Sequence, residues 1–235
     1  RKESGWNEQV HPHSSVYLVR KGSIMRIFIN PGHALGGRPD PGAVNLEYDI
    51  TEAEVNARIA RNCCIALERY GHHTKTVQSH NLRGEAPAYP NVTALANNWP
   101  ADVFLSIHAN AGGGRGCETY AFSECSWGHG LATIVQSSVH RAVSRLDKTF
   151  PDRGVKVNPD FTVLRRTAMP AILVETAFLD NEEDIRLLLD YPAVFGQAIA
   201  SGVDQFLRAH ITPEGELIYE EDEPAPMLWR YVPAQ

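Results

Sequence analysis

Two histidines and one glutamate stand at positions where buried strands are expected to end. His33 follows the first apolar segment of the patterned region, and His108 and Glu175 each end a later one. In open parallel sheets the ligand crevice lies beyond the carboxyl ends of the strands. A catalytic zinc ion usually takes three protein ligands from imidazole and carboxylate groups and keeps one position for water. These residues therefore predict the beginning of a metal-dependent hydrolytic site.

A further carboxylate ligand is expected among Glu47, Glu52 and Glu54. Thr51 and Glu54 have the spacing of a capping box, in which the glutamate reaches back to the backbone of the N-cap residue, and this gives Glu54 a structural role. Glu52 would occupy the first helical position, beside the loop that carries His33, where a carboxylate also suits the helix dipole. Glu47 lies in the preceding loop. Spacing alone does not decide between Glu52 and Glu47.

Short apolar segments alternate with longer segments whose apolar residues recur at helical spacing. The pattern predicts strands over residues 26–30, 74–77, 103–108, 161–164 and 171–175. It predicts helices over residues 52–70, 92–99, 131–146, 182–189 and 194–209. Strands that alternate with helices imply an α/β fold of three αβα layers with a mainly parallel, twisted central sheet.

Polar segments flank the patterned region on both sides. Residues 1–24 are aperiodic and are interpreted as an N-terminal linker or a segment added for expression, with no visible signal peptide. Residues 25–210 are expected to form one catalytic domain. Residues 211–235 combine an acidic cluster with prolines and are interpreted as a C-terminal linker or tail. This organisation leaves room for a further module beyond the C-terminal segment.

Composition limits the classes of partner. The net charge is −6 at pH 7 and no block of Lys and Arg occurs, so we expect no nucleic-acid partner, because phosphate binding needs clustered positive charge. No apolar run approaches the roughly 20 residues that span a bilayer, so no membrane span is expected. The four cysteines form no C-x-x-C pair. Cys63 and Cys64 lie in a helical pattern that favours burial, and we do not expect a Cys117–Cys125 disulfide.

Several motifs in a fixed order give the chain a resemblance to a known family. They are Asn30-Pro31-Gly32-His33, Asp40-Pro41-Gly42-Ala43, Glu52-x-x-x-Asn56, Ala96-Asn97, Ser106-Ile107-His108-Ala109-Asn110, Gly116–Tyr120, Asp152–Lys156, Pro170–Glu175 and Phe178–Asn181. Over about residues 26–207 the chain resembles the zinc-dependent N-acetylmuramoyl-L-alanine amidases of the amidase_3 type, which occur in bacterial cell-wall hydrolases and phage endolysins. The resemblance implies an enzyme that binds one zinc ion per chain and acts on peptidoglycan.

The resemblance also implies a role for each site residue. The family's zinc ligands fall on His33, Glu52 and His108, which favours Glu52 over Glu47. Its catalytic glutamate falls on Glu175. This carboxylate is expected to lie beside the metal as a general base and acid without serving as a ligand.

Asn110, Arg153 and Lys156 are further candidates for substrate contact, and each could equally be a structural hydrogen-bond donor. The chain departs from the family at two positions. Asn30 stands where the family often has aspartate, so the support of the first zinc ligand is expected to differ. Val92 stands where the family often has arginine. Neither position is a proposed ligand or base.

The expected reaction is zinc-dependent hydrolysis of the amide bond between N-acetylmuramic acid and L-alanine, with a zinc-bound water as nucleophile. Two alternatives stay open: a zinc peptidase that cuts within the stem peptide, and a non-catalytic peptidoglycan-binding module. We expect action at the cell wall or outside the cell, as a secreted autolysin or as a phage lysin. Residues 79–91 and 113–130 are candidates for segments that cover the crevice.

Overall fold

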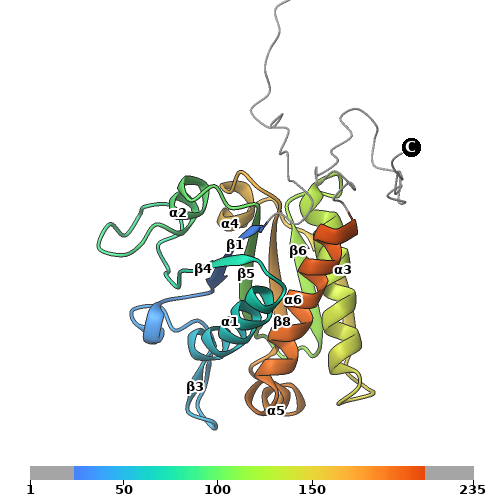
Figure 1. Ribbon diagram of the computed structural model, residues 1–235. Coiled ribbons are helices and arrows are strands. Elements are labelled where there is room, and N and C mark those ends of the chain that lie inside the picture. Colours follow the sequence, from blue (N-terminus) through green and yellow to red (C-terminus); the bar gives the residue numbers. More distant parts are fainter. Residues whose placement is uncertain (1–23, 210–235) are drawn as a thin grey trace, which may run out of the picture. The chain divides into compact units, whose positions relative to one another are not determined.

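The computed structural model describes residues 24–209. The predicted segments over residues 1–24 and 211–235 lie outside the described residues, apart from residue 24, so their interpretation as linkers stays a prediction. Within the described range, strands and helices alternate along the chain (Figure 1). None of the helices in residues 24–209 has the length and apolar character needed to cross a membrane.

A six-stranded sheet forms the centre of the domain, in the order β4-β1-β5-β8-β6-β7. The strands are β1 (Arg26–Pro31), β4 (His73–Thr76), β5 (Val103–Asn110), β6 (Cys117–Ala121), β7 (Asp152–Val157) and β8 (Ala171–Phe178). The first four strands in the sheet order are parallel. β6 runs antiparallel to β8 and parallel to β7. The prediction of a mainly parallel sheet is confirmed, with β6 and β7 running in the opposite direction at one edge.

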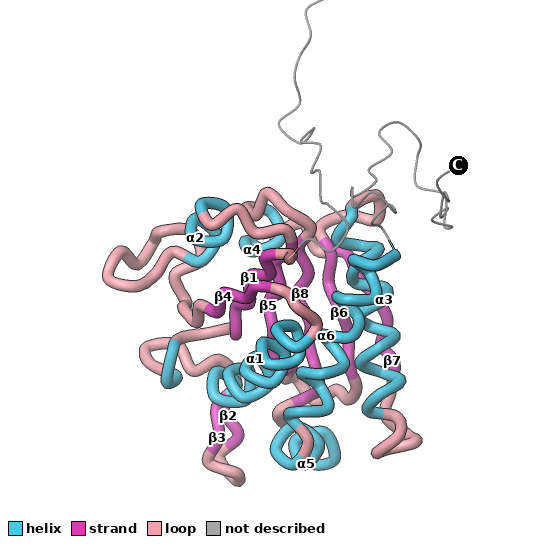
Figure 2. The backbone as a smooth tube through the Cα atoms, in the orientation of Figure 1, coloured by secondary structure: helices cyan, strands magenta, loops and turns pink. Residues whose placement is uncertain are grey.

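Helices cover both faces of this sheet (Figures 1 and 2). On one face lie α1 (Glu52–Arg69), α3 (Trp127–Val143) and α6 (Pro192–Ala209), and α6 packs against both of the others. The other face is covered by α2 (Val92–Asn98) and the short α4 (Thr162–Arg165), whose apolar residues share a core cluster with the strands. α5 (Glu182–Asp190) follows β8. A hairpin of β2 (Val44–Asn45) and β3 (Ile50–Thr51) and a short 3-10 turn, η1 (Leu35–Gly37), precede α1.

The alternation of side chains along the strands decides which face carries the candidate site. Phe104 of β5 stacks on Phe28 of β1, with ring centroids 5.6 Å apart, in the core beneath α2 and α4. Leu105 points to the opposite face. Because His108 lies an even number of residues from Phe104, it points to the α2 and α4 side. Glu175 is its register partner on β8 and points the same way.

The segment 161–164 was predicted as a strand, and this prediction is wrong. Phe161 is the N-cap residue of α4 and residues 162–164 lie in this helix, where Val163 and Leu164 are buried against the sheet. Such a short apolar run has no periodicity that separates a buried strand from a buried helical turn. Packing against Phe104 and Leu173 in one core cluster favours the turn.

The sequence pattern also missed β6 and β7, in which polar and charged residues interrupt the apolar ones. α3 begins at Trp127, ahead of the predicted start, because Ser126 caps its N-terminus by accepting a hydrogen bond from the His129 N–H. Cys63 is buried as predicted, while Cys64 is half-buried, and Cys117 and Cys125 are free, as expected.

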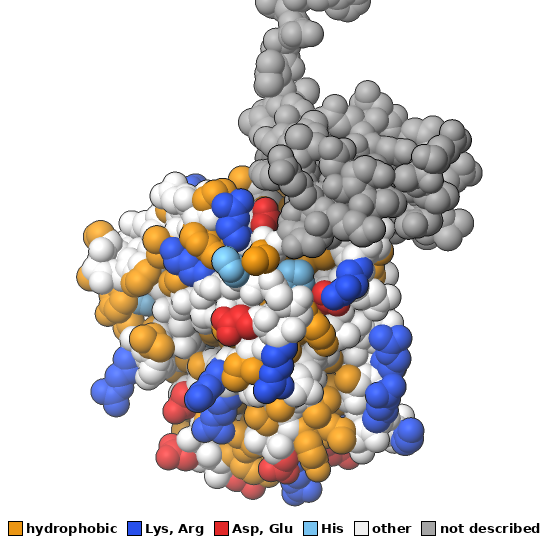
Figure 3. Space-filling model, viewed as in Figure 1, with side chains coloured by type: hydrophobic (Ala, Val, Ile, Leu, Met, Phe, Trp, Pro, Cys, Tyr) orange, Lys and Arg blue, Asp and Glu red, His pale blue; other side chains and the backbone are white. Residues whose placement is uncertain are grey.

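The three helices α1, α3 and α6 present a mixed outer surface. Figure 3 shows basic, acidic and apolar side chains interspersed over this face of the domain. In α1 the buried positions include Val55, Ile59, Cys63 and Leu67, which recur at helical spacing. The helices therefore bury one face against the sheet and leave the other to solvent.

Candidate metal centre

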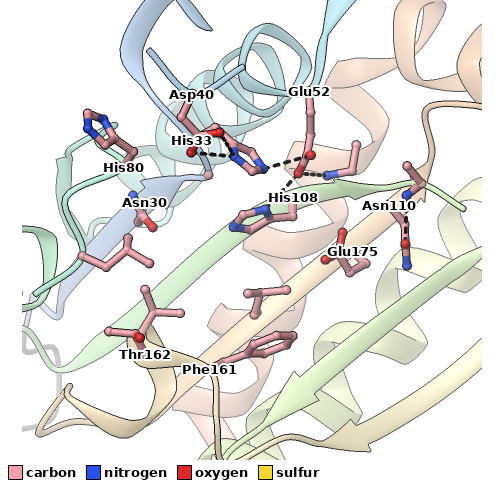
Figure 4. A pocket seen from close by; sticks show the side chains of 16 residues that line it. Asn30, His33, Asp40, Glu52, His80, His108, Asn110, Phe161, Thr162 and Glu175 are labelled. Atoms are coloured by element: carbon pink, nitrogen blue, oxygen red, sulfur yellow. Dashed lines mark hydrogen bonds and ion pairs between the residues drawn. The ribbon is translucent and has the colours of Figure 1, made fainter. Parts of the chain in front are cut away.

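His33, Glu52 and His108 come together at the carboxyl ends of β1 and β5 and the start of α1 (Figure 4). Their nearest donor atoms all lie within 4.8 Å of one another. The Nε2 atom of His33 is 2.9 Å from Glu52 Oε2, and the Nδ1 atom of His108 is 2.9 Å from Glu52 Oε1. Two imidazole nitrogens and one carboxylate are a donor set that catalytic zinc takes. The chemistry of these donors therefore fits a zinc ion.

The N-terminus of α1 determines where Glu52 points. Thr51 and Glu54 form the predicted capping box: the Thr51 N–H donates to Glu54 Oε2 at 2.9 Å, and Thr51 Oγ1 accepts from the Glu54 N–H at 3.3 Å. This holds Glu54 at the surface and leaves Glu52 pointing inward with 6% of its surface exposed. Asn56, one turn later, lies 3.4 Å from Glu52 Oε1 through its Nδ2 atom. Glu47 is exposed and lies outside the cluster.

Backbone groups fix the position of the Glu52 carboxylate, and the two histidines keep it ionised. The Ala43 N–H donates to Oε2 at 3.0 Å, and the Ala109 N–H donates to Oε1 at 3.3 Å. Burial raises the pKa of Glu52, but hydrogen bonds and positive charge from His108 and His33 outweigh it and hold the pKa well below the usual range. Glu52 is thus an anion at neutral pH, which suits a cation at this position.

Asp40 orients the ring of His33, a role that the sequence reading missed. Both carboxylate oxygens of Asp40 lie 3.0 Å from His33 Nδ1. Burial lowers the pKa of His33, but Glu52 and Asp40 together raise it to about 9. A hydrogen bond at one ring nitrogen directs the other toward the metal in most zinc sites. The signal was available, because Asp40 belongs to the second motif and follows His33 by one short loop.

Asn30 supports the site differently from the expectation. Its Nδ2 atom donates to the Val77 carbonyl at 2.9 Å, and its Oδ1 atom accepts from Ser106 Oγ at 3.2 Å. The first bond joins β1 to the residue that follows β4, and the second joins β1 to β5. The ring of His33 takes its support from Asp40, so the asparagine at position 30 leaves that support in place.

Two glycines provide the space that the ligand side chains occupy. A Cβ atom at Gly32 would lie 2.1 Å from His108 Cε1, and one at Gly42 would lie 2.5 Å from Glu52 Oε2. Gly42 also has a φ of 68°, which favours glycine. His33 itself has a φ of 69°. Such left-handed conformations of other residues are uncommon and cluster at functional sites.

We expect Asp40→Asn to weaken zinc binding by about 10-fold to 100-fold, because the amide keeps the size of the side chain but loses the charge that fixes His33. Zinc affinity measured by competition with a chromophoric chelator checks this. Glu47→Gln is the matched control, since it removes an exposed carboxylate from the same segment. Equal affinities in the two variants would contradict a role for Asp40 in orienting His33.

Glu175 faces the cluster from β8 without being part of it. It is the register partner of His108, and its buried Oε2 atom has no hydrogen-bond partner within the described part of the chain. Burial raises the pKa of Glu175 to about 7; the positive charge of His108 opposes this shift, and the negative charges of Glu52 and Glu118 add to it. A carboxyl group that titrates near neutrality can both accept and donate a proton during one reaction.

These groups line a cavity of about 400 Å³, a size that suits a small ligand or part of a larger one. The His33–Glu52–His108 cluster and Glu175 form its polar side. Four large apolar residues also line the wall: Leu82, Phe161, Val163 and Leu173. Figure 4 shows Phe161 and Thr162 of the α4 region across the cavity from the cluster. Of the two segments considered as covers, 79–91 contributes to this lining, and 113–130 does not.

The candidate substrate contacts meet at Glu118, another residue that the sequence reading did not single out. Its Oε1 atom accepts hydrogen bonds from Asn110 Nδ2 and the Tyr120 hydroxyl, both at 2.9 Å. Its Oε2 atom accepts from Arg153 Nε at 2.6 Å and from Lys156 Nζ. Asn110 lines the cavity, whereas the two cations are not among the residues that line it. The alternation of polar residues in the Gly116–Tyr120 motif was the available signal for a strand here.

Comparisons with known proteins point to one family. The family described as N-acetylmuramoyl-L-alanine amidase matches residues 27–205. The sporulation-specific N-acetylmuramoyl-L-alanine amidase of Bacillus subtilis is 36% identical over 179 residues, or 76% of this chain and 65% of the relative. This chain therefore spans just under two thirds of that relative's length.

A phage protein and a solved structure are also similar. The endolysin of Bacillus phage SPP1 is 29% identical over 205 residues, which cover 85% of this chain and 72% of the endolysin. The solved structure of the N-acetylmuramoyl-L-alanine amidase AmiC2 of Nostoc punctiforme has a TM-score of 0.65 at 28% identity, and the match covers 78% of this chain and 97% of that one.

Proposed function

Since this chain belongs to the N-acetylmuramoyl-L-alanine amidase family, we propose that it hydrolyses the amide bond between N-acetylmuramic acid and L-alanine in peptidoglycan. The observation that carries this proposal is the His33–Glu52–His108 cluster, which lies in one cavity with Glu175. An amide is a poor electrophile with a poor leaving group, so its hydrolysis needs help at the carbonyl and at the nitrogen. The cluster would act at the carbonyl, and Glu175 would act at the nitrogen.

We assign one zinc ion per chain to His33 Nε2, His108 Nδ1 and the Glu52 carboxylate. When bound, zinc would polarise the scissile carbonyl and make a water molecule more acidic. The residues around the ligands support this assignment. Asp40 holds His33 so that Nε2 faces Glu52, and the low pKa of Glu52 keeps that carboxylate charged.

Glu175 would move the protons. Its Oε2 atom has no hydrogen-bond partner in the described part of the chain and lies in a residue that lines the cavity, so it can accept a proton from the attacking water. The same carboxyl group can then pass the proton to the departing amine. Glu118, the register partner of Glu175 on β6, is a poor substitute, because four donors already occupy its two oxygens.

Asn110 and Arg153 remain proposed substrate contacts. The Asn110 side chain bonds to Glu118 and accepts from the Ala111 N–H at 2.8 Å, which leaves one amide hydrogen for a ligand. Peptidoglycan as the substrate places the proposed site of action at the cell wall. The similarity to a sporulation amidase and to an endolysin is consistent with an autolysin or a lysin. A further cell-wall-binding module beyond the C-terminal segment stays a prediction.

Mass spectrometry of the products tests the proposed bond. The zinc-loaded protein, incubated with purified peptidoglycan, is expected to release stem peptides that begin with a free L-alanine amine and to leave the glycan strands intact. Peptides cut between two amino acids would instead indicate a zinc peptidase. Sedimentation with peptidoglycan and no released peptide would indicate a non-catalytic binding module.

A further inference from the structure

Glu118 and Glu175 are two carboxylates in directly opposed positions of the β6–β8 pair. Like charges in such a pair repel each other. Two cations, Arg153 and Lys156, offset the charge of Glu118, which is only 2% exposed. These three side chains together carry more positive than negative charge. The second cation balances Glu175 when that carboxylate is ionised, and it leaves a net positive charge beside the catalytic cavity when Glu175 is protonated.

Arg153 is fixed in place with donors to spare. Its Nε atom donates to Glu118 at 2.6 Å, and its guanidinium carbon lies 4.9 Å from the centre of the Phe178 ring. About a third of the side chain, 35%, is exposed. Within the described part of the chain, no hydrogen bond or ion pair engages the two Nη groups. A guanidinium held at Nε with free Nη groups is ready to bind a carboxylate in bidentate fashion.

Lys156 adds a second charge at the same place. Its ammonium group contacts Glu118 and lies 5.7 Å from the centre of the Tyr120 ring. The side chain is 37% exposed. Both cations are therefore anchored on one side by a buried carboxylate and an aromatic ring, and both reach solvent on the other side.

The proposed reaction determines which part of the substrate would reach these cations. Glu175 protonates the leaving amine, so the stem peptide extends from the cluster past Glu175. Figure 4 shows Glu175 and Asn110 on one side of the cluster, and His80 and Asn30 on the other. Asn110 is bonded to Glu118, so the peptide side of the cavity is the side where Arg153 lies.

The length of the substrate peptide matches the distance across the sheet from Glu175 to Arg153. Neighbouring strands lie about 4.8 Å apart, so the Glu118 carboxylate and the Arg153 guanidinium bonded to it are on the order of 5–8 Å from Glu175. Two residues of extended peptide span about 7 Å. The second residue of a bacterial stem peptide is a glutamate joined through its side chain, and its α-carboxylate is free unless it has been amidated. This carboxylate would thus come within reach of Arg153.

We propose that Arg153, assisted by Lys156 and held by Glu118, is the subsite for the free α-carboxylate of the second stem-peptide residue. This inference rests on the proposed amidase function. It makes the enzyme selective for stem peptides in which that carboxylate is free over those in which it is an amide.

Two muramyl tripeptides test the subsite, one with the free α-carboxylate on its second residue and one with the carboxamide there. The wild-type enzyme is expected to cleave the carboxylate form with a kcat/KM about 10-fold to 100-fold higher, mainly through KM, because a charge-assisted bidentate contact is lost in the amide. Arg153→Gln is expected to bring the ratio of the two kcat/KM values close to one. Arg61→Gln, an exposed position on α1, is the control and is expected to keep the wild-type ratio.

If Arg153 only supports Glu118, Arg153→Gln will lower both kcat/KM values equally and keep their ratio. That result would overturn the inference. So would a wild-type ratio near one. A second pair of tripeptides carries either a carboxylate or an amide on the third residue. The ratio of their kcat/KM values must be the same in the wild type and in Arg153→Gln. A change in this ratio would mean that Arg153 binds the carboxylate of the third residue instead. If Arg153→Gln does not fold, Lys156→Gln must lower the ratio by itself. Cleavage of neither tripeptide by the wild type would overturn the proposed function, and the subsite with it.

Discussion

Glu175→Gln is expected to slow peptidoglycan hydrolysis by about 10²–10⁴-fold while zinc stays bound. The amide has the size and shape of the carboxyl group, so the surrounding packing should hold. The amide cannot take a proton from water. Within the described residues the Glu175 Oε2 atom has no hydrogen-bond partner, so the substitution breaks no hydrogen bond at that atom. A dye-release assay on labelled peptidoglycan measures the rate, and metal analysis of the same sample measures the zinc.

Glu182→Gln is the matched control, because Glu182 is an exposed glutamate on the helix after β8, with 72% of its side chain accessible. It is expected to keep the wild-type rate. Wild-type hydrolysis by zinc-loaded Glu175→Gln would remove Glu175 from the mechanism. Loss of zinc together with the rate would instead make Glu175 a metal ligand, which contradicts its assigned role.

The same residue should determine the acid side of the pH–rate profile. Burial raises the pKa of Glu175 to about 7 in the metal-free protein. The base form is the ionised one, so hydrolysis is lost as the pH falls through the pKa of this group. A bound dication favours the ionised form, so the acid limb of the loaded enzyme is expected below pH 7.

His108→Ala is expected to abolish hydrolysis and to lower zinc affinity by on the order of 100-fold or more, because it removes one of only three protein ligands. His33 and the Glu52 carboxylate would remain, but two ligands hold zinc weakly. The control is His73→Ala, which removes an exposed histidine from β4. Zinc content after dialysis, measured beside the activity, checks both variants.

His108→Ala separates two explanations of a lost rate. Added zinc in excess should restore part of the activity if the histidine serves only as a ligand, because the remaining ligands and Glu175 are intact. Full zinc content at wild-type affinity in this variant would contradict the assigned ligand set.

The sequence predicted those parts of the site that local patterns determine. His33 follows one apolar segment, and His108 and Glu175 lie near the ends of two others, although β5 and β8 continue to Asn110 and Phe178. The capping box of Thr51 and Glu54 indicated the start of α1, but spacing left Glu52 and Glu47 open, and the family resemblance favoured Glu52. Both signals depend on residues close in the chain. The fold class followed from the same alternation of strands and helices.

Other features depend on contacts that are distant in sequence. Glu118 and Arg153 are 35 positions apart and pair only because β6 and β7 are neighbours in the sheet. Neither strand has the apolar run that reveals β1 or β5, so both were missed. Asp40 was visible as part of a motif, but its contact with the His33 ring depends on a loop conformation that includes the left-handed backbone of His33 and Gly42.

Anomalous X-ray scattering at the zinc absorption edge, on crystals of the zinc-loaded protein, tests the central claim most directly. The proposal predicts one strong peak, about 2.0–2.2 Å from His33 Nε2, His108 Nδ1 and a Glu52 oxygen, with Glu175 beyond coordination distance. A peak elsewhere in the molecule, or one that Glu175 coordinates in place of Glu52, would contradict it.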